Sequence, residues 1–226
     1  PAECKKMVTA AEKSGKILQI GHCIRFWPEY IKTKEIIDSG EYGKVLAANF
    51  QRLSRPGTWN DWMNIGEKSG GALLDLHIHD LDYIQYVFGI PQAVFCRGVK
   101  GPGGGYDHVS ASYIYENNMV IAAEGGWMMA PGFGFEMSFN VVLEKATITY
   151  DNTRNPVFKV CPVEGEVIVP EVDKRGGHVL ELIHFVKAVK GEPVANVLTP
   201  TDSLNSIKIC FAEKESIEKG KIVLIK

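Results

Sequence analysis

The chain has 226 residues, of which 45% are hydrophobic and 23% charged, and its formal net charge is −2. This length and composition predict a globular protein with a full hydrophobic core, and the dispersed basic residues exclude the charged surface that binds nucleic acid. No apolar run approaches the roughly 20 residues that span a bilayer, and no signal peptide is seen, so we expect no membrane partner.

The cysteines are widely spaced and form no CxxC pair: Cys4, Cys23, Cys96, Cys161 and Cys210. An odd number without pairing motifs predicts reduced thiols and a cytoplasmic location, and argues against a disulfide framework or a zinc ribbon. The first residue is Pro1 rather than Met, which favours a processed chain or a piece of a longer protein.

The first part of the chain alternates between helical and extended stretches. Helix-forming residues followed by a terminal glycine predict helices over residues 2–14, 28–39 and 70–89. Short apolar runs predict strands over residues 16–22 and 44–54. Between the second strand and the third helix lies a long loop that carries Trp59, Asp61 and Trp62.

After Pro91 the pattern changes to a period of two. Residues 92–170 form several short stretches with apolar side chains at alternate positions, joined by Gly, Asn and Pro turns. One stretch places five apolar side chains on a single face: Phe133, Phe135, Met137, Phe139 and Val141. This alternation is typical of an antiparallel sheet that packs on one side.

The C-terminal part returns to helical patterns over residues 178–190 and 200–219, and ends in a short predicted strand over 221–225. Thr199 is the expected N-cap of the last helix, with Asp202 completing a near capping box and Gly220 ending it. The fold class is therefore α+β: a large, mainly antiparallel open sheet with helices on one face.

The predicted helix over 70–89 carries titratable residues in an otherwise apolar stretch: Asp75, His77, His79, Asp80 and Asp82. At about 100° per residue, Asp75, His79 and Asp82 fall within roughly a 60° arc. His77 lies near the apolar stripe and Asp80 lies apart. The row is either a solvated helix face or an acid–base site in which a carboxylate one turn away tunes His79.

A metal site at the HxH pair is disfavoured, because on a helix the rings of His77 and His79 point about 200° apart. His77 is instead expected to be a hydrogen-bonded core histidine. Gly103–Gly105 is expected to be a turn between strands, because no helix opens after it to hold a phosphate.

Several motifs follow one another along the chain: "GHCIRFWPEY", a Trp-bearing loop, "GGALLDLHIHDLD", a strand-rich half and "ELIHFVKAVKGEPVANVLTPTDSL". Their order resembles the glucose–fructose oxidoreductase/inositol dehydrogenase/MocA (Gfo/Idh/MocA) family of NAD(P)-dependent sugar and polyol dehydrogenases. The D-x-x-x-H and GH…RF.P blocks are the most specific, and the resemblance covers essentially the whole chain. It implies a sheet domain like the C-terminal domain of glyceraldehyde-3-phosphate dehydrogenase.

The same resemblance implies two parts: residues 1–21 as the C-terminal remnant of a Rossmann dinucleotide-binding domain, and residues 22–226 as a substrate-binding and oligomerisation domain. The chain begins at the proline that would follow the family's catalytic lysine, and it has no GxGxxG after a strand. The chain alone is therefore expected to be inactive, with NAD or NADP bound mainly by residues outside it.

The resemblance also implies roles for individual residues. His79 would be the general base that takes the proton from a CHOH group during hydride transfer, and Asp75 would hold substrate hydroxyls or orient His79. The expected substrate-binding residues are His22, Trp59, Asp61 and Asp82. Asp82 is also placed to pin the helix to the sheet, and the loop residues could instead only anchor their loop. Arg25 would border the cofactor or form an ion pair between the domains.

Two alternatives stay open. One is a cofactor-free binding or assembly module built on the same sheet domain, and the other is a metal-dependent hydrolase or isomerase that uses His77 and His79. The family resemblance also implies a homodimer or homotetramer formed through the sheet face. The expected small-molecule partner is a sugar, a polyol or a related compound.

Overall fold

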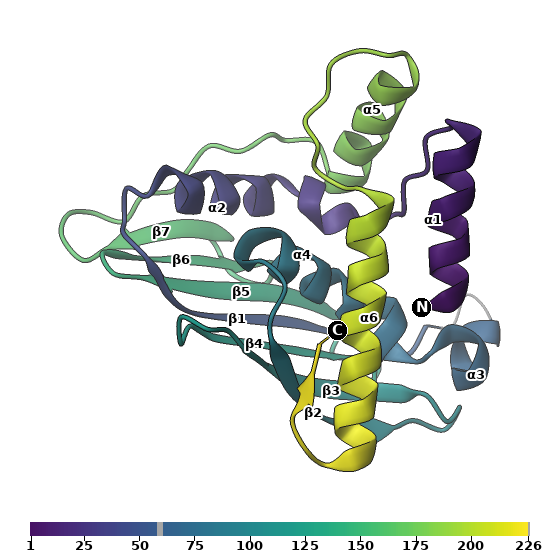
Figure 1. Cartoon of the computed structure of the whole chain (residues 1–226). Helices are drawn as coiled ribbons and strands as arrows, with labels where there is room; N and C mark the ends of the chain where they lie inside the picture. Colours follow the sequence, from purple (N-terminus) through teal and green to yellow (C-terminus); the bar gives the residue numbers. More distant parts are fainter. Residues whose placement is uncertain (58–60, 226) are drawn as a thin grey trace.

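The computed structural model describes residues 1–57 and 61–225. At its centre is an eight-stranded sheet in the order β7-β6-β5-β1-β4-β3-β2-β8, with the helices on one face (Figure 1). Neighbouring strands pair antiparallel except β1 and β4, so the predicted α+β class is confirmed. The strands are β1 Val45–Ser54, β2 Ala93–Lys100, β3 Tyr106–Ile114, β4 Val120–Gly126, β5 Phe135–Leu143, β6 Ala146–Asp151, β7 Phe158–Pro162 and β8 Val223–Leu224.

The pairing register sorts the side chains of the sheet onto a covered face and an open face. One row across the covered face is buried throughout: Phe158, Tyr150, Phe139, Phe50, Ala123, Ala111 and Cys96. The adjacent row on the open face is exposed or half-buried: Lys159, Thr149, Asn140, Asn49, Ala122, Ser112 and Phe95. The period-two pattern in the sequence is thus the division between core and open face.

The predicted face of β5 is confirmed for Met137, Phe139 and Val141, which are buried. Phe133 and Phe135, at the start of the same row, are 37% and 46% exposed. They stay exposed because Phe133 precedes the strand and Phe135 is its first residue.

The helices begin and end close to the predicted positions. Gly15, Gly40 and Gly220 each end a helix with a left-handed backbone conformation, and the capping box of Thr199 and Asp202 is complete. The helical segments are α1 Ala2–Ser14, η1 Cys23–Phe26, α2 Pro28–Ser39, η2 Asp61–Asn64, α3 Gly66–Ser69, η3 Leu73–His77, α4 Ile78–Phe88, α5 Gly177–Val189 and α6 Pro200–Lys219.

Two expectations were wrong at the level of local structure. Residues 16–22 are not a strand, because they pair with no strand in the part of the chain that the structure describes. The helix expected over 70–89 is divided, since η3 is a π-helical turn and the α-helix starts only at Ile78. The turn expected at Gly103–Gly105 is confirmed, and it joins β2 to β3.

An aromatic cluster fixes α2 and α4 on the sheet. The Tyr30 ring lies 4.8 Å from both the Tyr83 ring of α4 and the Phe139 ring of β5, in T-shaped arrangements. The Tyr83 hydroxyl donates to the Tyr30 carbonyl oxygen at 2.6 Å. Helix α4, which carries His79, is therefore held by packing on two sides.

The described parts of the chain, residues 1–57 and 61–225, include no helix with the length and hydropathy that a bilayer crossing needs. The cysteines are free thiols, as predicted.

Candidate active site

The titratable residues of segment 75–82 separate into groups that are paired inside the protein and groups that are not. Asp80 is fully buried and accepts two hydrogen bonds from Arg52 of β1, each of 2.9 Å. This two-pronged pairing matches the fork of the guanidinium to the carboxylate. It ties α4 to the sheet and leaves Asp80 without a free oxygen for a ligand.

Asp82 is also fully buried and paired. Arg25 donates to it at 2.6 and 2.9 Å, and Ser206 of α6 donates at 2.7 Å. Although burial alone raises the pKa of this carboxyl, the contacts with His22 and Arg25 outweigh burial and lower it. Asp82 therefore stays ionised and holds η1, α4 and α6 together.

This geometry bears on two expected site residues, whose roles stay predictions. Asp82 was expected to contact substrate or to pin the helix to the sheet, and its carboxylate is enclosed by protein donors. Arg25 was expected to contact the cofactor, but it is 2% exposed and also donates to the Val197 carbonyl oxygen at 2.8 Å. The ion pair that the sequence offered as the alternative for Arg25 is present, and both its members lie within residues 22–226.

His77 is the core histidine that the helical pattern predicted. It has no exposed surface, and its Nε2 lies 3.1 Å from Glu213 Oε1 of α6. Its neighbours differ from those of His79, which faces His22. A metal-dependent hydrolase of the expected kind would need His77 and His79 to bind one ion together. Their different neighbours argue against such a site. The described residues contain no cluster of three His, Cys, Asp or Glu side chains arranged around a metal.

Asp75 and His79 are the two titratable groups of the segment that remain partly exposed. Asp75 lies in the π-helical turn, where burial raises the pKa of its carboxyl. His79 lies in the first turn of α4, and burial lowers the pKa of its imidazole to about 3, with the positive charges of Arg52 and His22 adding to the effect. Its Nδ1 is buried without a hydrogen-bond partner.

His22 lies between His79 and the buried ion pair of Arg25 and Asp82. Its ring centre lies 6.1 Å from that of His79, and its Nδ1 lies 3.0 Å from Asp82 Oδ1. His22 directly precedes η1, so the same short segment that supplies Arg25 places a second imidazole beside His79. Among the described residues expected to bind substrate, His22 and Asp82 lie close enough to His79 to affect the pKa of its imidazole.

Helix α5 supplies two residues that the sequence reasoning missed, His178 and Glu181. Gln19 Nε2 donates to Glu181 Oε1 at 3.5 Å, and the His178 ring packs edge-on against Trp27 at 5.2 Å. Burial raises the pKa of Glu181, opposed by Gln19 and by the neighbouring histidines, with His22 among them. Their i, i+3 spacing places both on one helix face, but nothing local in the sequence shows that this face meets His22.

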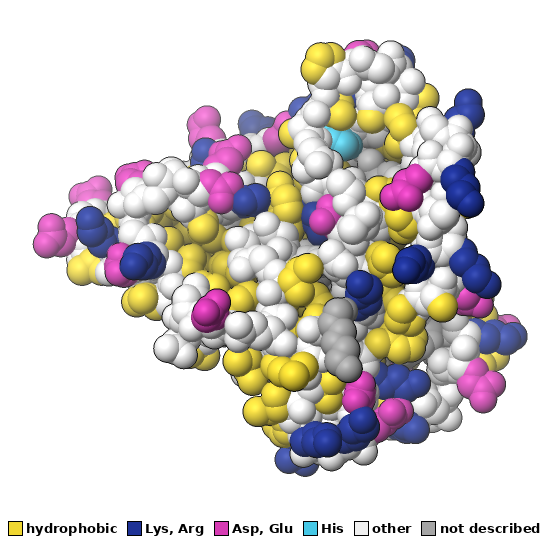
Figure 2. Space-filling view, viewed as in Figure 1, with side chains coloured by type: hydrophobic (Ala, Val, Ile, Leu, Met, Phe, Trp, Pro, Cys, Tyr) yellow, Lys and Arg dark blue, Asp and Glu magenta, His cyan; other side chains and the backbone are white. Residues whose placement is uncertain are grey.

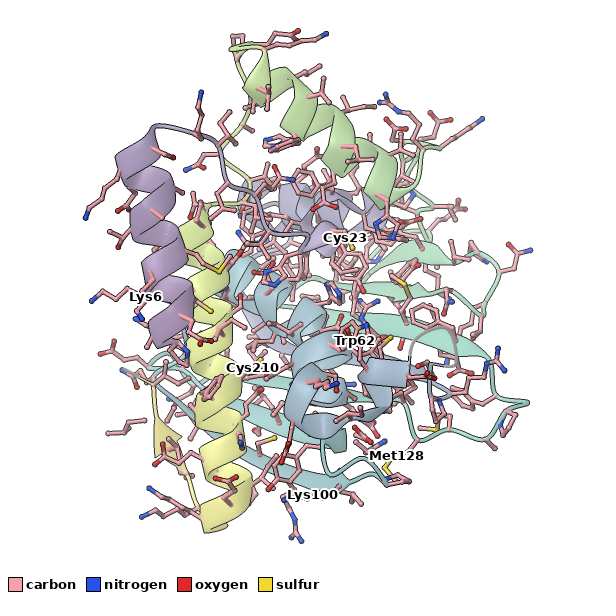
Figure 3. All side chains as sticks on the ribbon, turned by 90° about the vertical axis from the view of Figure 1, so that its right-hand side faces the viewer. Lys6, Cys23, Trp62, Lys100, Met128 and Cys210 are labelled. Atoms are coloured by element: carbon pink, nitrogen blue, oxygen red, sulfur yellow. The ribbon has the colours of Figure 1, made fainter. Side chains whose placement is uncertain are left out.

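The tryptophan loop is only partly described. Trp59 lies outside the described residues, and Asp61 is exposed at the start of η2. Trp62 is 46% exposed and, like Met128 after β4, lies on the side of the molecule that faces the viewer in Figure 3.

A groove of about 550 Å³ lies next to Gln19. It is bounded by α1, α5 and residues 194–201, and its lining includes Gln19 and His184. Figure 2 shows this hollow with a histidine side chain at its floor and apolar side chains around it. The groove reaches Gln19, which donates to Glu181, but His22, Asp75 and His79 are not among its lining residues.

Asp75 and His79 are both of residue types that can transfer protons. A neutral imidazole accepts a proton. A carboxyl group whose pKa is raised by burial can accept or donate a proton at a pH near that pKa. The phosphates of a dinucleotide find no cradle in the glycine turn at 101–105, because that turn leads into a strand rather than a helix N-terminus. This turn therefore offers no site for the phosphates of a dinucleotide.

Comparison with known proteins assigns the family. The profile of the GFO/IDH/MocA C-terminal domain matches residues 30–149, more than half of the chain, so the chain belongs to this family. The myo-inositol 2-dehydrogenase of Thermotoga maritima is 25% identical over 237 residues, covering 98% of this chain and 68% of that protein.

A second relative has a different named activity. The 2,7-anhydro-N-acetylneuraminate hydratase of Mediterraneibacter gnavus is 31% identical over 126 residues, covering 53% of this chain and 31% of that protein. Among solved structures, a levoglucosan dehydrogenase in complex with NADH and levoglucosan superposes with a TM-score of 0.85 at 20% identity, over 99% of this chain and 70% of that one. The matched part of the chain thus spans between 26% and 70% of the length of these and other related proteins.

Proposed function

We propose that this chain is the substrate-binding part of an NAD(P)-dependent oxidoreductase that oxidises a CHOH group of a sugar, a polyol or a related small molecule. The observation that carries the proposal is the selective exposure within segment 75–82. Every other titratable group there is buried and paired, while Asp75 and His79 remain available. The family membership and the sugar- and polyol-related names of the relatives support the substrate class.

In the proposed reaction the carbon loses a hydride and its hydroxyl loses a proton, giving a ketone. The nicotinamide ring, when bound, supplies the hydride acceptor. His79 takes the hydroxyl proton, and its lowered pKa means that the imidazole is in the neutral, accepting form at pH 7. Asp75 binds neighbouring substrate hydroxyls or orients His79, and His22 borders the reacting carbon.

The cofactor is proposed to be bound mainly by residues outside this chain, which would leave residues 1–21 as the end of a Rossmann domain. A titration of NADH and NADPH, followed by energy transfer from tryptophan, tests this. We expect no binding to the 226-residue chain and binding to a version extended upstream of Pro1. Binding by the chain as given would overturn the division at residues 21 and 22.

The oxidoreductase activity itself is tested with the longer protein and a panel of sugars and polyols. Formation of NADH or NADPH by the wild type is expected, with kcat lowered about 10²- to 10⁴-fold by His79→Gln, the range for losing a general base. Glu35→Gln, at an exposed position of α2, is the matched control and is expected to keep kcat. A His79→Gln variant with wild-type kcat would refute the assignment of the base.

A second candidate is a net hydration of a sugar derivative, which the names of two relatives, each 31% identical over about half of the chain, favour. The same pair, His79 and Asp75, would then move protons without a net change in the cofactor. Product analysis separates the two reactions: consumption of substrate at constant NADH absorbance, with a mass gain of one water, favours hydration.

A further inference from the structure

A second group of titratable side chains lies directly beneath the candidate site and takes no part in the proposed chemistry. His77 of η3, Tyr113 of β3 and Glu213 of α6 meet in the core, and none is more than 2% exposed. The Tyr113 hydroxyl donates to Glu213 Oε1 at 2.6 Å, and His77 Nε2 lies 3.1 Å from the same oxygen. Because a carboxylate oxygen accepts hydrogen bonds, this contact assigns the proton of His77 to Nε2.

This cluster is costly to bury. His77 Nδ1 and Glu213 Oε2 are both buried without a hydrogen-bond partner. Apolar side chains of similar volume often stabilise a core as well as, or better than, such a group. Stability alone therefore gives no reason for a histidine, a tyrosine and a glutamate at this place.

The position of the cluster in the chain supplies a reason. His77 is the last residue of the π-helical turn Leu73–His77, which contains Asp75, and it lies two residues before His79. A π-turn closes i→i+5 hydrogen bonds and so holds one more residue than an α-turn, an arrangement that persists only where the surroundings favour it.

The sheet is also shaped to receive this histidine. Gly125 lies in β4 against His77, and a Cβ built on Gly125 would come within 2.7 Å of His77 Cβ and 2.8 Å of Nδ1. Glycine weakens the interior of a strand and marks places where another group approaches closely. Three elements, β3, β4 and α6, thus converge on the end of the π-turn.

We propose that His77, Glu213 and Tyr113 form a positioning cluster that holds the π-helical turn and thereby sets the orientation of Asp75 relative to His79. The cluster pulls the end of the turn toward α6 and β3. Without it, the segment is free to close as an ordinary α-helix, which rotates Asp75 about the helix axis while the Arg52 and Arg25 pairs keep α4 in place. The claim that the cluster holds the π-helical turn does not depend on the proposed function. Its consequence for catalysis rests on the proposed function.

The structural part is tested by NMR on the 226-residue chain. Glu213→Met removes the acceptor at similar volume, and Glu213→Gln keeps an acceptor oxygen. In Glu213→Met we expect the amide signals of residues 73–77 to move and the titration midpoint of Asp75 to fall by at least about 0.5 pH unit, toward an exposed carboxyl. Glu213→Gln is expected to restore both toward wild type.

A control variant separates an effect on the π-helical turn from a general loss of stability. Thr33→Val removes a different buried hydrogen bond, in α2, and is expected to lower stability without moving the Asp75 midpoint. Should Glu213→Met not fold, Tyr113→Phe removes one donor and is expected to shift the same signals in the same direction by less. Unchanged signals of residues 73–77 and Asp75 in the folded variant would overturn the proposal.

Activity of the longer protein separates the two levels. With the NMR shift present, a fall in kcat/KM of at least about 10-fold in Glu213→Met, recovered in Glu213→Gln, supports the catalytic consequence. With the NMR shift present and kcat/KM unchanged, the proposed roles of Asp75 and His79 fail while the positioning of the turn stands.

Discussion

At the scale of single residues, the main distinction is between charged groups that are paired inside the protein and charged groups that are not. Asp80 and Asp82 obtain arginines from far along the chain, Arg52 and Arg25, and His77 obtains Glu213. Burying an unpaired charge is so costly that these partners decide which residues can serve as a site. Asp75 and His79 are what remains.

The pair Arg52–Asp80 makes this argument testable. Arg52→Met leaves the fully buried Asp80 without its partner, and we expect the free energy of unfolding in urea to fall by about 3–5 kcal/mol. The double variant Arg52→Met with Asp80→Leu removes both charges and should recover much of that loss. A loss below about 1 kcal/mol in the single variant would contradict the pairing seen here.

His79 makes a prediction about pH. The pKa of its imidazole is about 3 in the folded chain and near 6.5 when unfolded, so between these values the unfolded state binds more protons. Its contribution to stability is therefore present above pH 6.5 and is lost as the pH falls toward 3.

Urea unfolding at pH 7 and pH 5 measures this contribution. We expect wild type to lose up to about 2 kcal/mol more than His79→Gln over this interval, the upper limit holding for complete burial. His77, whose pKa Glu213 raises against the effect of burial, is present in both proteins and cancels from the difference. Equal losses in the two proteins would show that His79 titrates normally.

The residue scale also shows how far sequence reasoning reached. The D-x-x-x-H motif singled out Asp75 and His79, and the helical pattern placed His77 in the core. Nothing in the sequence assigned Arg25 to Asp82 or brought Glu181 near His22, because those pairs lie 57 and 159 positions apart. Tertiary packing alone decides such partners.

At the scale of elements, the helix caps were predictable and the π-turn was not. The signals at Gly15, Gly40 and Thr199 are local, so the sequence predicts these ends directly. The extra residue in Leu73–His77 has no local signal, because a period of 3.6 fits residues on both sides of it. The strand expected at 16–22 failed for a related reason, since a strand also requires a partner.

Gly125 is the element-scale test of the fit between β4 and η3. Gly125→Ala places a Cβ 2.7 Å from His77 Cβ, which cannot move without its helix. Overpacking of this kind costs about 1–3 kcal/mol, and we expect a loss in that range by thermal or urea unfolding. Adding His77→Gly removes the Cβ and the imidazole that the new methyl group meets, so a double variant as unstable as the sum of the singles would argue against this contact.

At the scale of the whole molecule, the sheet has one face packed and one face bare. The helices cover the face that carries Phe50 and Phe139. The opposite face carries a patch of exposed apolar residues: Leu46, Ile114, Val120 and Val142. Their exposed fractions range from 36% to 64%. Contiguous apolar surface of this kind on a sheet is commonly an interface with another protein chain.

We therefore predict that the chain self-associates through this open face, as a homodimer or homotetramer. Light scattering after size exclusion should give a mass at least twice that of the 25.0 kDa chain. Val120→Glu places a charge in the centre of the patch, next to Ala47 of β1, and should shift the mass to that of the monomer without loss of folding, because the side chain is already 64% exposed. Val189→Glu, at a 59% exposed position on α5, is the matched control and should leave the mass unchanged. A wild-type monomer at high concentration would contradict the prediction, and dissociation by Val189→Glu instead would move the interface to α5.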